Sequence, residues 1–421
     1  MDYSIFIYLI LTVLVVALGW FVNLAAARAD GGQCIFRASC NTGRGRRHES
    51  IDSFEYSPAD GSRIDLKRNQ AAGNEGSDRC GCERQCRRYA DVTRQKMLNR
   101  ILIAAVFLLL FAVSACRIAV GNDYWVYRSD FLLIEQNRHV SFEFGFVWVV
   151  RFLQSMLNHD QYLPIFAVFS FFTVLFFVRG MADLSEQFCF TIFLIMTGGY
   201  YFSSLNSVRY YLVLAIAMYS IKYVLQGEWT KFILWILAAA AFHKSVLVVI
   251  PMYFLASRNW KRRHMLLLAA GCASLLLFQD FYRRIIFYFY PFYEGSMFDT
   301  GETSLTNIAK CAAVLVLSLL YYKMAIKEDE KNRFFFYCNL GALVLYVFAS
   351  FIPEISRIGY YLNITNIFLI PGIIIKIPEK RQRILWTVLV TAAFLGYFGL
   401  FLRSAYSTDI RLLPYRNWIF Q

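Results

Sequence analysis

Several charged and polar side chains in this 421-residue sequence lie inside or beside strongly hydrophobic segments. A charged group in or near hydrocarbon is costly unless it is paired or hydrated, so a functional role is expected for it. The relevant stretches are "CRIAVGNDYWVY", "EFGF", "SSLNSVRYY", "FHKS" and "SRIGYY".

These residue types suit chemistry at a phosphate. Arginines that face one cavity can bind phosphate or pyrophosphate through paired N–H donors. A carboxylate or an imidazole beside them could take the proton of a sugar hydroxyl group. The candidates are Arg117, Arg209 and Arg357 for the anion, Asp123, Glu143 and His243 for proton transfer, and Asn206, Lys244 and Tyr360 for supporting contacts.

The composition excludes an ordinary soluble domain as the setting for this chemistry. The chain is 58% hydrophobic and 18% aromatic, and apolar runs near the length of a bilayer span recur along it. The formal net charge of +14 is the expected effect of Lys and Arg in cytoplasmic loops. No basic stripe is interleaved with aromatics, so no nucleic acid is expected as a partner. The sequence has no P-loop, GxSxG or HExxH motif.

The sequence predicts an all-α polytopic membrane protein with about twelve transmembrane helices. A short apolar stretch at 142–157 contains Arg151 and is expected to form an interfacial or re-entrant helix. The expected spans are 3–26, 99–118, 160–180, 188–205, 207–226, 230–243, 245–257, 264–280, 305–323, 333–352, 358–376 and 383–402.

Three basic loops orient these spans. The loops "SRNWKRRH", "KMAIKEDEKNR" and "KIPEKRQR" are predicted to be cytoplasmic by the positive-inside rule. All three stay on one side only if 230–257 is a hairpin that turns at "FHKS" rather than one long helix. This topology places both termini outside. It also brings the candidate residues to the extracytoplasmic ends of their spans.

Each candidate also has a plainer interpretation. Arg117 could be a span-end residue whose side chain reaches the interface, and the acids could be ordinary loop residues. Lys244 could be a solvated turn residue and His243 a packed one. Arg209 and Arg357 are harder to explain in this way, because the positive-inside rule disfavours arginine on the outer face.

Three segments make up the expected domain organisation. Residues 1–26 are the first transmembrane helix, and 99–421 form the polytopic membrane domain. Residues 27–98 are polar, without apolar periodicity, and are predicted to be a largely disordered cytoplasmic loop. This loop contains "CGCERQC", whose spacing is not that of a regular zinc site, so no metal is expected, although metal binding stays an alternative.

From about residue 100 to its end, the chain resembles the EpsG family. The resemblance rests on "RIAVGNDYWVY", "EFGF", "LNSVRYYL", "AAFHKSVL", "SRIGYYL" and "LLPYRNW". The best block is Asn206–Arg209 followed by Phe242, His243 and Ser245. Two departures are the long loop at 27–98 and Tyr210, where the family pattern leads us to expect Gln.

The resemblance implies a Wzy-type polysaccharide polymerase with a GT-C-like helical bundle. Such enzymes join oligosaccharide repeat units linked to undecaprenyl pyrophosphate, in exopolysaccharide, capsule or O-antigen biosynthesis. It implies a multi-pass protein of the bacterial inner (cytoplasmic) membrane with an extracytoplasmic active face and no cofactor. The implied partners are the lipid-linked oligosaccharide, membrane lipid, and flippase and chain-length regulator proteins.

Three other functions are open at this point. A flippase or exporter of lipid-linked sugars also needs a cationic cavity, but one that reaches the inner leaflet. A membrane acyltransferase would favour His with Asp or Glu over arginines. The third alternative is a non-catalytic scaffold of the polysaccharide assembly complex.

Overall fold

The computed structural model describes most of the chain outside the long polar loop. The described residues are 4–22, 75–157, 162–289, 291, 294–295, 305–349, 351–352, 355–407 and 410–419, without the side chains of 75–92, 262 and 289. The chain divides into two compact units, one of Met1–Leu24 with Asn99–Gln421 and one of Ala25–Leu98. All the candidate residues belong to the first unit.

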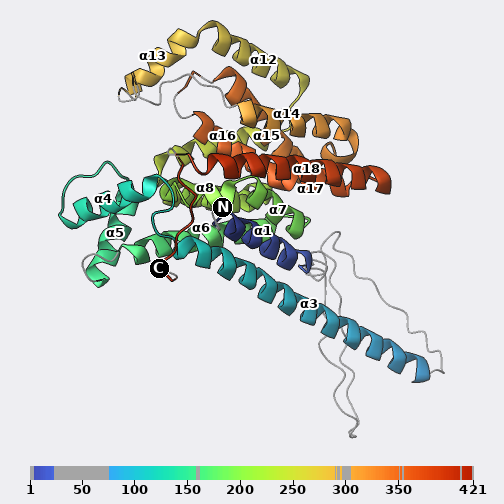
Figure 1. Cartoon of the computed structure of the whole chain (residues 1–421). Coiled ribbons are helices and arrows are strands. Elements are labelled where there is room, and N and C mark those ends of the chain that lie inside the picture. Colours follow the sequence, from blue (N-terminus) through green and yellow to red (C-terminus); the bar gives the residue numbers. More distant parts are fainter. Residues whose placement is uncertain are drawn as a thin grey trace, which may run out of the picture. The chain divides into compact units, whose positions relative to one another are not determined.

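The described residues are folded into helices, and their only β-type pairing is an isolated bridge between Arg117 and Asn417. In chain order, the helices of the described residues begin with α1 (Ser4–Trp20), α3 (Glu75–Ala115), α4 (Asp123–Glu135), α5 (Phe144–Met156), α6 (Leu163–Leu184), α7 (Phe188–Thr197), α8 (Tyr200–Ser203), α9 (Val208–Leu225) and α10 (Trp229–Ala240). They are followed by η2 (Lys244–Val248), α11 (Val249–Ala256), α12 (Arg262–Leu277), α13 (Gln279–Phe289), α14 (Leu305–Leu320), η4 (Tyr322–Ile326), α15 (Glu330–Phe348), α16 (Ile355–Asn363), α17 (Asn366–Ile375) and α18 (Lys380–Ser404) (Figure 1).

Fewer helices of the described part of the chain reach the length of a membrane span than the sequence predicted. Within the described residues, five helical segments are long and apolar enough to cross a membrane, or six if the bent pair α12–α13 is one span. About twelve spans are therefore not confirmed. Most of the remaining apolar segments are helical but are too short or interrupted, since a core of about 30 Å needs about 20 residues. The five are Thr93–Ala115, Leu163–Leu184, Val208–Leu225, Ile355–Ile375 and Lys380–Ser404.

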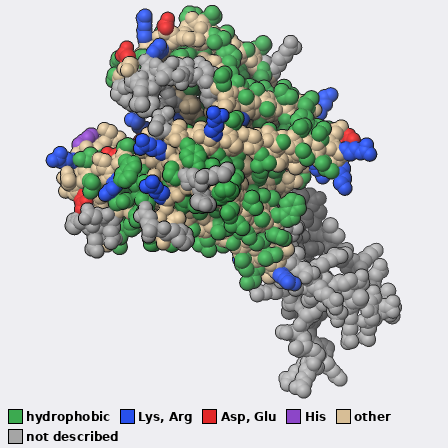
Figure 2. Space-filling view, in the orientation of Figure 1, with side chains coloured by type: hydrophobic (Ala, Val, Ile, Leu, Met, Phe, Trp, Pro, Cys, Tyr) green, Lys and Arg blue, Asp and Glu red, His purple; other side chains and the backbone are tan. Residues whose placement is uncertain are grey.

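These apolar helices make the chain a multi-pass membrane protein. Hydrophobic side chains cover much of the face shown in Figure 2, with Lys and Arg in separate groups. In soluble proteins such a surface would be a liability, whereas in a bilayer it meets lipid.

Two segments have a structure that differs from the one predicted from the sequence. Residues 75–98 belong to helix α3, whereas the sequence predicted disorder as far as residue 98. Residues 23–74 lie outside the described residues, and the side chains of "CGCERQC" are not described either, so the metal question is untested. The expected span 264–280 is instead α12 followed by α13 after a bend of 82°.

The helical hairpin at "FHKS" is present. α10 ends at Ala240, and His243 has an extended backbone (φ −160°) before η2 begins at Lys244. Because α10 packs against both η2 and α11, the chain turns back at this point. The short apolar helix expected near 142–157 is α5.

Helix α9 lies at the centre of the first unit. It packs against α6 and α10, and also contacts α11 and α16. Its sequence, "VRYYLVLAIAMYSIKYVL", is apolar on nearly every side, which suits a helix buried all round. Arg209, its second residue, is therefore held on one of the most enclosed helices.

The C-terminal segment fixes the loop that leads into α4. The Gly121 N–H donates to the Arg411 carbonyl (2.7 Å), and the Asn122 N–H donates to the Ile410 carbonyl (3.1 Å). The Tyr8 hydroxyl of α1 donates to the Leu412 carbonyl at 2.8 Å. Gly121 has a φ of +90°, and an added Cβ would lie 2.8 Å from Asn206. Close packing thus sets the position of the first turn of α4.

We expect Gly145→Ala to destabilise the fold. The Gly145 N–H donates to the Ala241 carbonyl at 2.9 Å, and a Cβ on Gly145 would meet that oxygen at 2.7 Å. Overpacking of this kind costs about 1–3 kcal/mol. Thermal unfolding in detergent, followed by circular dichroism, should show a lower midpoint.

The control for this prediction is Gly271→Ala in α12. No atom lies within 4 Å of an added Cβ there, and alanine is the better helix former by up to about 1 kcal/mol. An unchanged midpoint for Gly145→Ala would contradict the close approach of α5 to the hairpin turn.

Candidate functional site

A cavity of about 170 Å³ lies where α4, α9, α16 and the hairpin turn meet. We call it the cationic cavity. It is lined by Asp123, Val126, Tyr127, Phe142, Ser207, Arg209, Tyr210, His243 and Arg357. Four of the residues proposed from sequence, from four separate segments, thus face one space.

Arg209 is held by an ion pair and by aromatic rings. Its Nη1 lies 2.5 Å from Glu143 Oε2, and the side chains of Arg209 and Glu143 are only 16% and 18% exposed. The Arg209 guanidinium carbon lies 3.8 Å from the centre of the Phe142 ring. Partial burial strengthens both interactions, because water screens them less.

Glu143 joins α5 to the hairpin turn. While Oε2 accepts from Arg209, Oε1 accepts from the Lys244 backbone N–H at 3.1 Å. Both carboxylate oxygens are therefore engaged. The catalytic role predicted for Glu143 stays untested, and these contacts favour a positioning role. The Lys244 side chain is exposed.

Asp123 is the first residue of α4. Its Oδ2 accepts from the Ser207 hydroxyl at 2.7 Å, and its backbone N–H donates to Asn206 Oδ1 at 2.9 Å. These two bonds tie α4 to the segment that precedes α9. They keep the carboxylate at the wall of the cavity that Arg209 also lines.

His243 is neutral at neutral pH. Burial, followed by the cations Arg209, Arg357 and Lys244, lowers its pKa to about 4 against the opposing effect of Glu143. Its Nδ1 lies 2.8 Å from the Ser245 hydroxyl. A neutral imidazole beside a polar partner can accept a proton, which an imidazolium cannot do.

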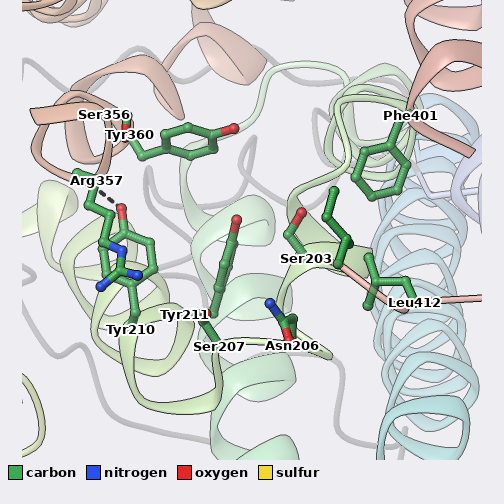
Figure 3. A pocket seen from close by; sticks show the side chains of 11 residues that line it. Ser203, Asn206, Ser207, Tyr210, Tyr211, Ser356, Arg357, Tyr360, Phe401 and Leu412 are labelled. Atoms are coloured by element: carbon green, nitrogen blue, oxygen red, sulfur yellow. Dashed lines mark hydrogen bonds between the residues drawn. The ribbon is translucent and has the colours of Figure 1, made fainter. Parts of the chain in front are cut away.

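A second cavity of about 240 Å³ adjoins the first. We call it the tyrosine cavity, and Figure 3 shows its side chains. Ser207, Tyr210 and Arg357 line both cavities. The complete lining is Ser203, Asn206, Ser207, Tyr210, Tyr211, Ser356, Arg357, Tyr360, Phe401, Ile410 and Leu412.

Arg357 stands at the boundary between the two cavities. It belongs to α16, and the Tyr210 hydroxyl of α9 donates to its backbone carbonyl at 2.6 Å. This bond fixes the start of α16 against α9. Because Arg357 lines both cavities, a ligand in either one would lie beside this residue.

Comparison with known proteins decides the family. The EpsG family model matches residues 100–417, about three quarters of the chain. The chain belongs to the EpsG family. No curated protein and no solved structure matches it.

Family membership associates this EpsG-family protein with polysaccharide biosynthesis at a membrane and with glycosyltransferase-like polymerases. The matched range includes every candidate site residue and stops before the end of the C-terminal segment. It excludes the polar loop, so the site belongs to the family domain.

Arg117 lies apart from both cavity linings. It is 1% exposed, and Nη1 donates to Ser170 Oγ at 2.9 Å and to the Ser114 carbonyl. The guanidinium also lies 5.3 Å from the Phe166 ring centre. These contacts suit a packed cation that holds helices together. The predicted pyrophosphate contact of Arg117 stays untested.

Sequence reasoning missed the residues between the candidates. Ser207, Tyr210 and Tyr211 flank Arg209 in the EpsG-family protein and line the cavities. Their position beside Arg209 in "NSVRYY" could have identified them as site residues, but tyrosines are common throughout the chain. Ser245 was seen only as part of the turn, and its hydroxyl lies 2.9 Å from that of Tyr361.

The donor set here is not that of a metal site. Within the described ranges, no group of three His, Cys, Asp or Glu residues is placed to hold a metal ion. Among the candidates, the cavity linings supply two arginines, one carboxylate and one imidazole. This combination suits an anion and a proton transfer.

We predict that acid destabilises the protein through His243. Its pKa of about 4 in the folded state is below the usual value of about 6.5. The folded state therefore binds fewer protons, and its stability is complete above about pH 6.5 and falls as pH drops toward 4. Thermal unfolding of wild type and His243→Gln between pH 4 and 7 measures this difference.

The loss of stability over that range should be smaller in His243→Gln than in wild type. Equal losses in the two proteins would contradict a neutral, partly buried His243. A His264→Gln variant, altered at a histidine of α12 that lines neither cavity, should follow wild type.

Proposed function

We propose that this protein polymerises oligosaccharide repeat units linked to undecaprenyl pyrophosphate, for exopolysaccharide, capsule or O-antigen. The observation that carries the proposal is the cationic cavity. Arg209 and Arg357 line it together with Asp123 and His243, so anion-binding and proton-accepting groups share one space. Family membership supports the substrate class.

The reaction transfers the growing chain to the next repeat unit. The bond between the anomeric carbon and a pyrophosphate oxygen breaks, and undecaprenyl pyrophosphate leaves with the electron pair. The acceptor hydroxyl of the incoming unit forms the new bond to that carbon and loses its proton to a base. The products are a chain longer by one unit and free undecaprenyl pyrophosphate.

The arginines act on the leaving group. Negative charge grows on the pyrophosphate as the bond breaks, and Arg209 and Arg357 stabilise that charge in a partly dehydrated site. Each guanidinium can make two parallel N–H bonds to phosphate oxygens. No metal is needed to explain this stabilisation.

Two residues are suited to accept the proton. Asp123 presents a carboxylate oriented by Ser207, and His243 is neutral at the working pH. Both line the cationic cavity, so the acceptor hydroxyl is expected to approach from that side.

We place the protein in the bacterial cytoplasmic membrane with the site on its extracytoplasmic side. The supporting observation is that the hairpin turn at His243 and the basic loop "SRNWKRRH" lie at opposite ends of η2–α11. Lipid-linked repeat units delivered by a flippase, with chain length set by a regulator, would then meet the site directly.

Arg209→Ala and Arg357→Ala should each lower polymerisation by about 100-fold or more, since the loss of one transition-state donor typically has that effect. The assay mixes purified protein with undecaprenyl-pyrophosphate-linked repeat units and resolves the product ladder on a gel. Arg209→Lys should recover only part of the activity, because lysine keeps the charge and loses the paired donors.

Arg128→Ala is the matched control. Arg128 is in α4, stacks near Tyr162 (4.8 Å to the ring centre) and lines neither cavity. It should keep the wild-type ladder. Wild-type ladders from Arg209→Ala would overturn the assignment, and lipid binding without any ladder in wild type would favour a transporter or a scaffold.

A further inference from the structure

We propose that the tyrosine cavity binds the sugar ring joined directly to the pyrophosphate, and that it selects an uncharged or acidic sugar. The inference rests on the proposed function, since it assumes a pyrophosphate in the cationic cavity. It adds a saccharide subsite and a charge preference to that function.

The first argument is adjacency. Ser207, Tyr210 and Arg357 line both cavities. A ligand that places its pyrophosphate between Arg209 and Arg357 must extend its next group past Arg357. The sugar is covalently attached to the phosphate, so the cavity on the other side of Arg357 is the nearest space for it.

The second argument is the chemistry of the lining. Tyr211 stands between Tyr210 and Ser203 in Figure 3, and Tyr360 lies across from it. Aromatic faces suit the apolar C–H faces of a pyranose ring, while phenolic hydroxyls remain available for hydrogen bonds. Serine hydroxyls act as donors and acceptors for sugar hydroxyl groups.

Asn206 adds an oriented donor. Its Oδ1 accepts from the Asp123 backbone N–H, so its amide nitrogen is the remaining polar atom. Figure 3 shows that nitrogen on the side facing Tyr211 and Ser207. A single amide thus connects the first turn of α4 to a position suited to a sugar hydroxyl.

The third argument is charge and size. Among the eleven lining residues, Arg357 alone is charged, and none is Asp or Glu. A protonated amino sugar would meet a cation without a carboxylate to pair with it. The volume of about 240 Å³ is below the lower end, roughly 300 Å³, of cavities that take drug-sized ligands. One ring fits this space better than an oligosaccharide.

A polyprenyl tail is a poorer occupant of this cavity. The three serines, Asn206 and Arg357 make up five of the eleven lining residues. A hydrocarbon chain cannot hydrogen-bond to these polar side chains, and covering a polar lining with hydrocarbon is unfavourable. A sugar can satisfy them.

The test is a binding measurement on the full-length protein in lipid nanodiscs. The probes are undecaprenyl pyrophosphate alone, undecaprenyl pyrophosphoryl-glucose and undecaprenyl pyrophosphoryl-glucosamine with a free amine. Microscale thermophoresis or native mass spectrometry gives the dissociation constants. We expect glucose to increase affinity about tenfold over the bare pyrophosphate lipid, and glucosamine to give no increase.

Substitutions test which residues produce the increase in affinity given by glucose. Tyr211→Ala and Tyr360→Ala should lose the increase given by glucose while binding undecaprenyl pyrophosphate as wild type does. Arg209→Ala should weaken binding of all three probes. Tyr223→Ala, altered at a tyrosine of α9 that lines neither cavity, should match wild type. If an alanine variant fails to fold, Tyr211→Phe replaces it in the binding test, because phenylalanine keeps the aromatic ring.

The outcomes separate the two proposals. If wild type binds none of the lipid probes, the proposed function fails. If it binds undecaprenyl pyrophosphate and glucose adds nothing, or glucosamine adds as much as glucose, the function stands and the sugar-subsite inference is overturned. The wild-type comparison alone decides this, so no variant has to fold for the test to count.

Discussion

A cation on a buried membrane helix needs a counter-charge, and in this protein Arg209 is such a cation. The pair with Glu143 at 2.5 Å is set among Phe142 and Phe146. Removing either partner would leave a charge without compensation in a partly buried place, which is costly. Arg209 can therefore line the cationic cavity only if α5 is positioned so that Glu143 reaches the Arg209 guanidinium group.

Much of the local structure follows from that constraint. The Lys244 N–H and the Ala241 carbonyl hold the start of α5 through Glu143 and Gly145. The same hairpin turn presents His243 to the cavity. One ion pair thus connects α9, α5 and the turn, and an anionic ligand would meet Arg209 already oriented.

The C-terminal segment provides a second support. Its backbone accepts from Gly121 and Asn122, next to Asp123, and Ile410 and Leu412 line the tyrosine cavity. Residues about 290 positions apart in the chain are therefore hydrogen-bonded to each other beside the two cavities. The C-terminal segment thus contributes to the cavities, which lie beside the start of α9.

The sequence predicted an all-helical membrane protein, and charged residues in apolar context were conspicuous enough to single out candidates that the fold brings together. Asp123, Arg209, His243 and Arg357 meet in one cavity, and the break at His243 is where the charge pattern required a turn. The count of about twelve spans is not confirmed, because hydropathy does not reveal breaks such as Gly198–Gly199 in the apolar run 188–205.

The groups that contact each buried side chain could not be predicted from the sequence. Arg117 resembles the other arginines in its context, yet serine hydroxyls and a carbonyl surround it in the packed interior. Tyr210 and Tyr211 gain their importance only from the position of α16 and the C-terminal segment. Such contacts depend on tertiary packing, which local patterns do not encode.

The most direct test of the central claim is a cryo-EM structure of the protein in nanodiscs with undecaprenyl pyrophosphate. The account predicts phosphate density between the guanidinium groups of Arg209 and Arg357, with Asp123 and His243 beside it. Phosphate density at another site, with the cationic cavity empty, would contradict it.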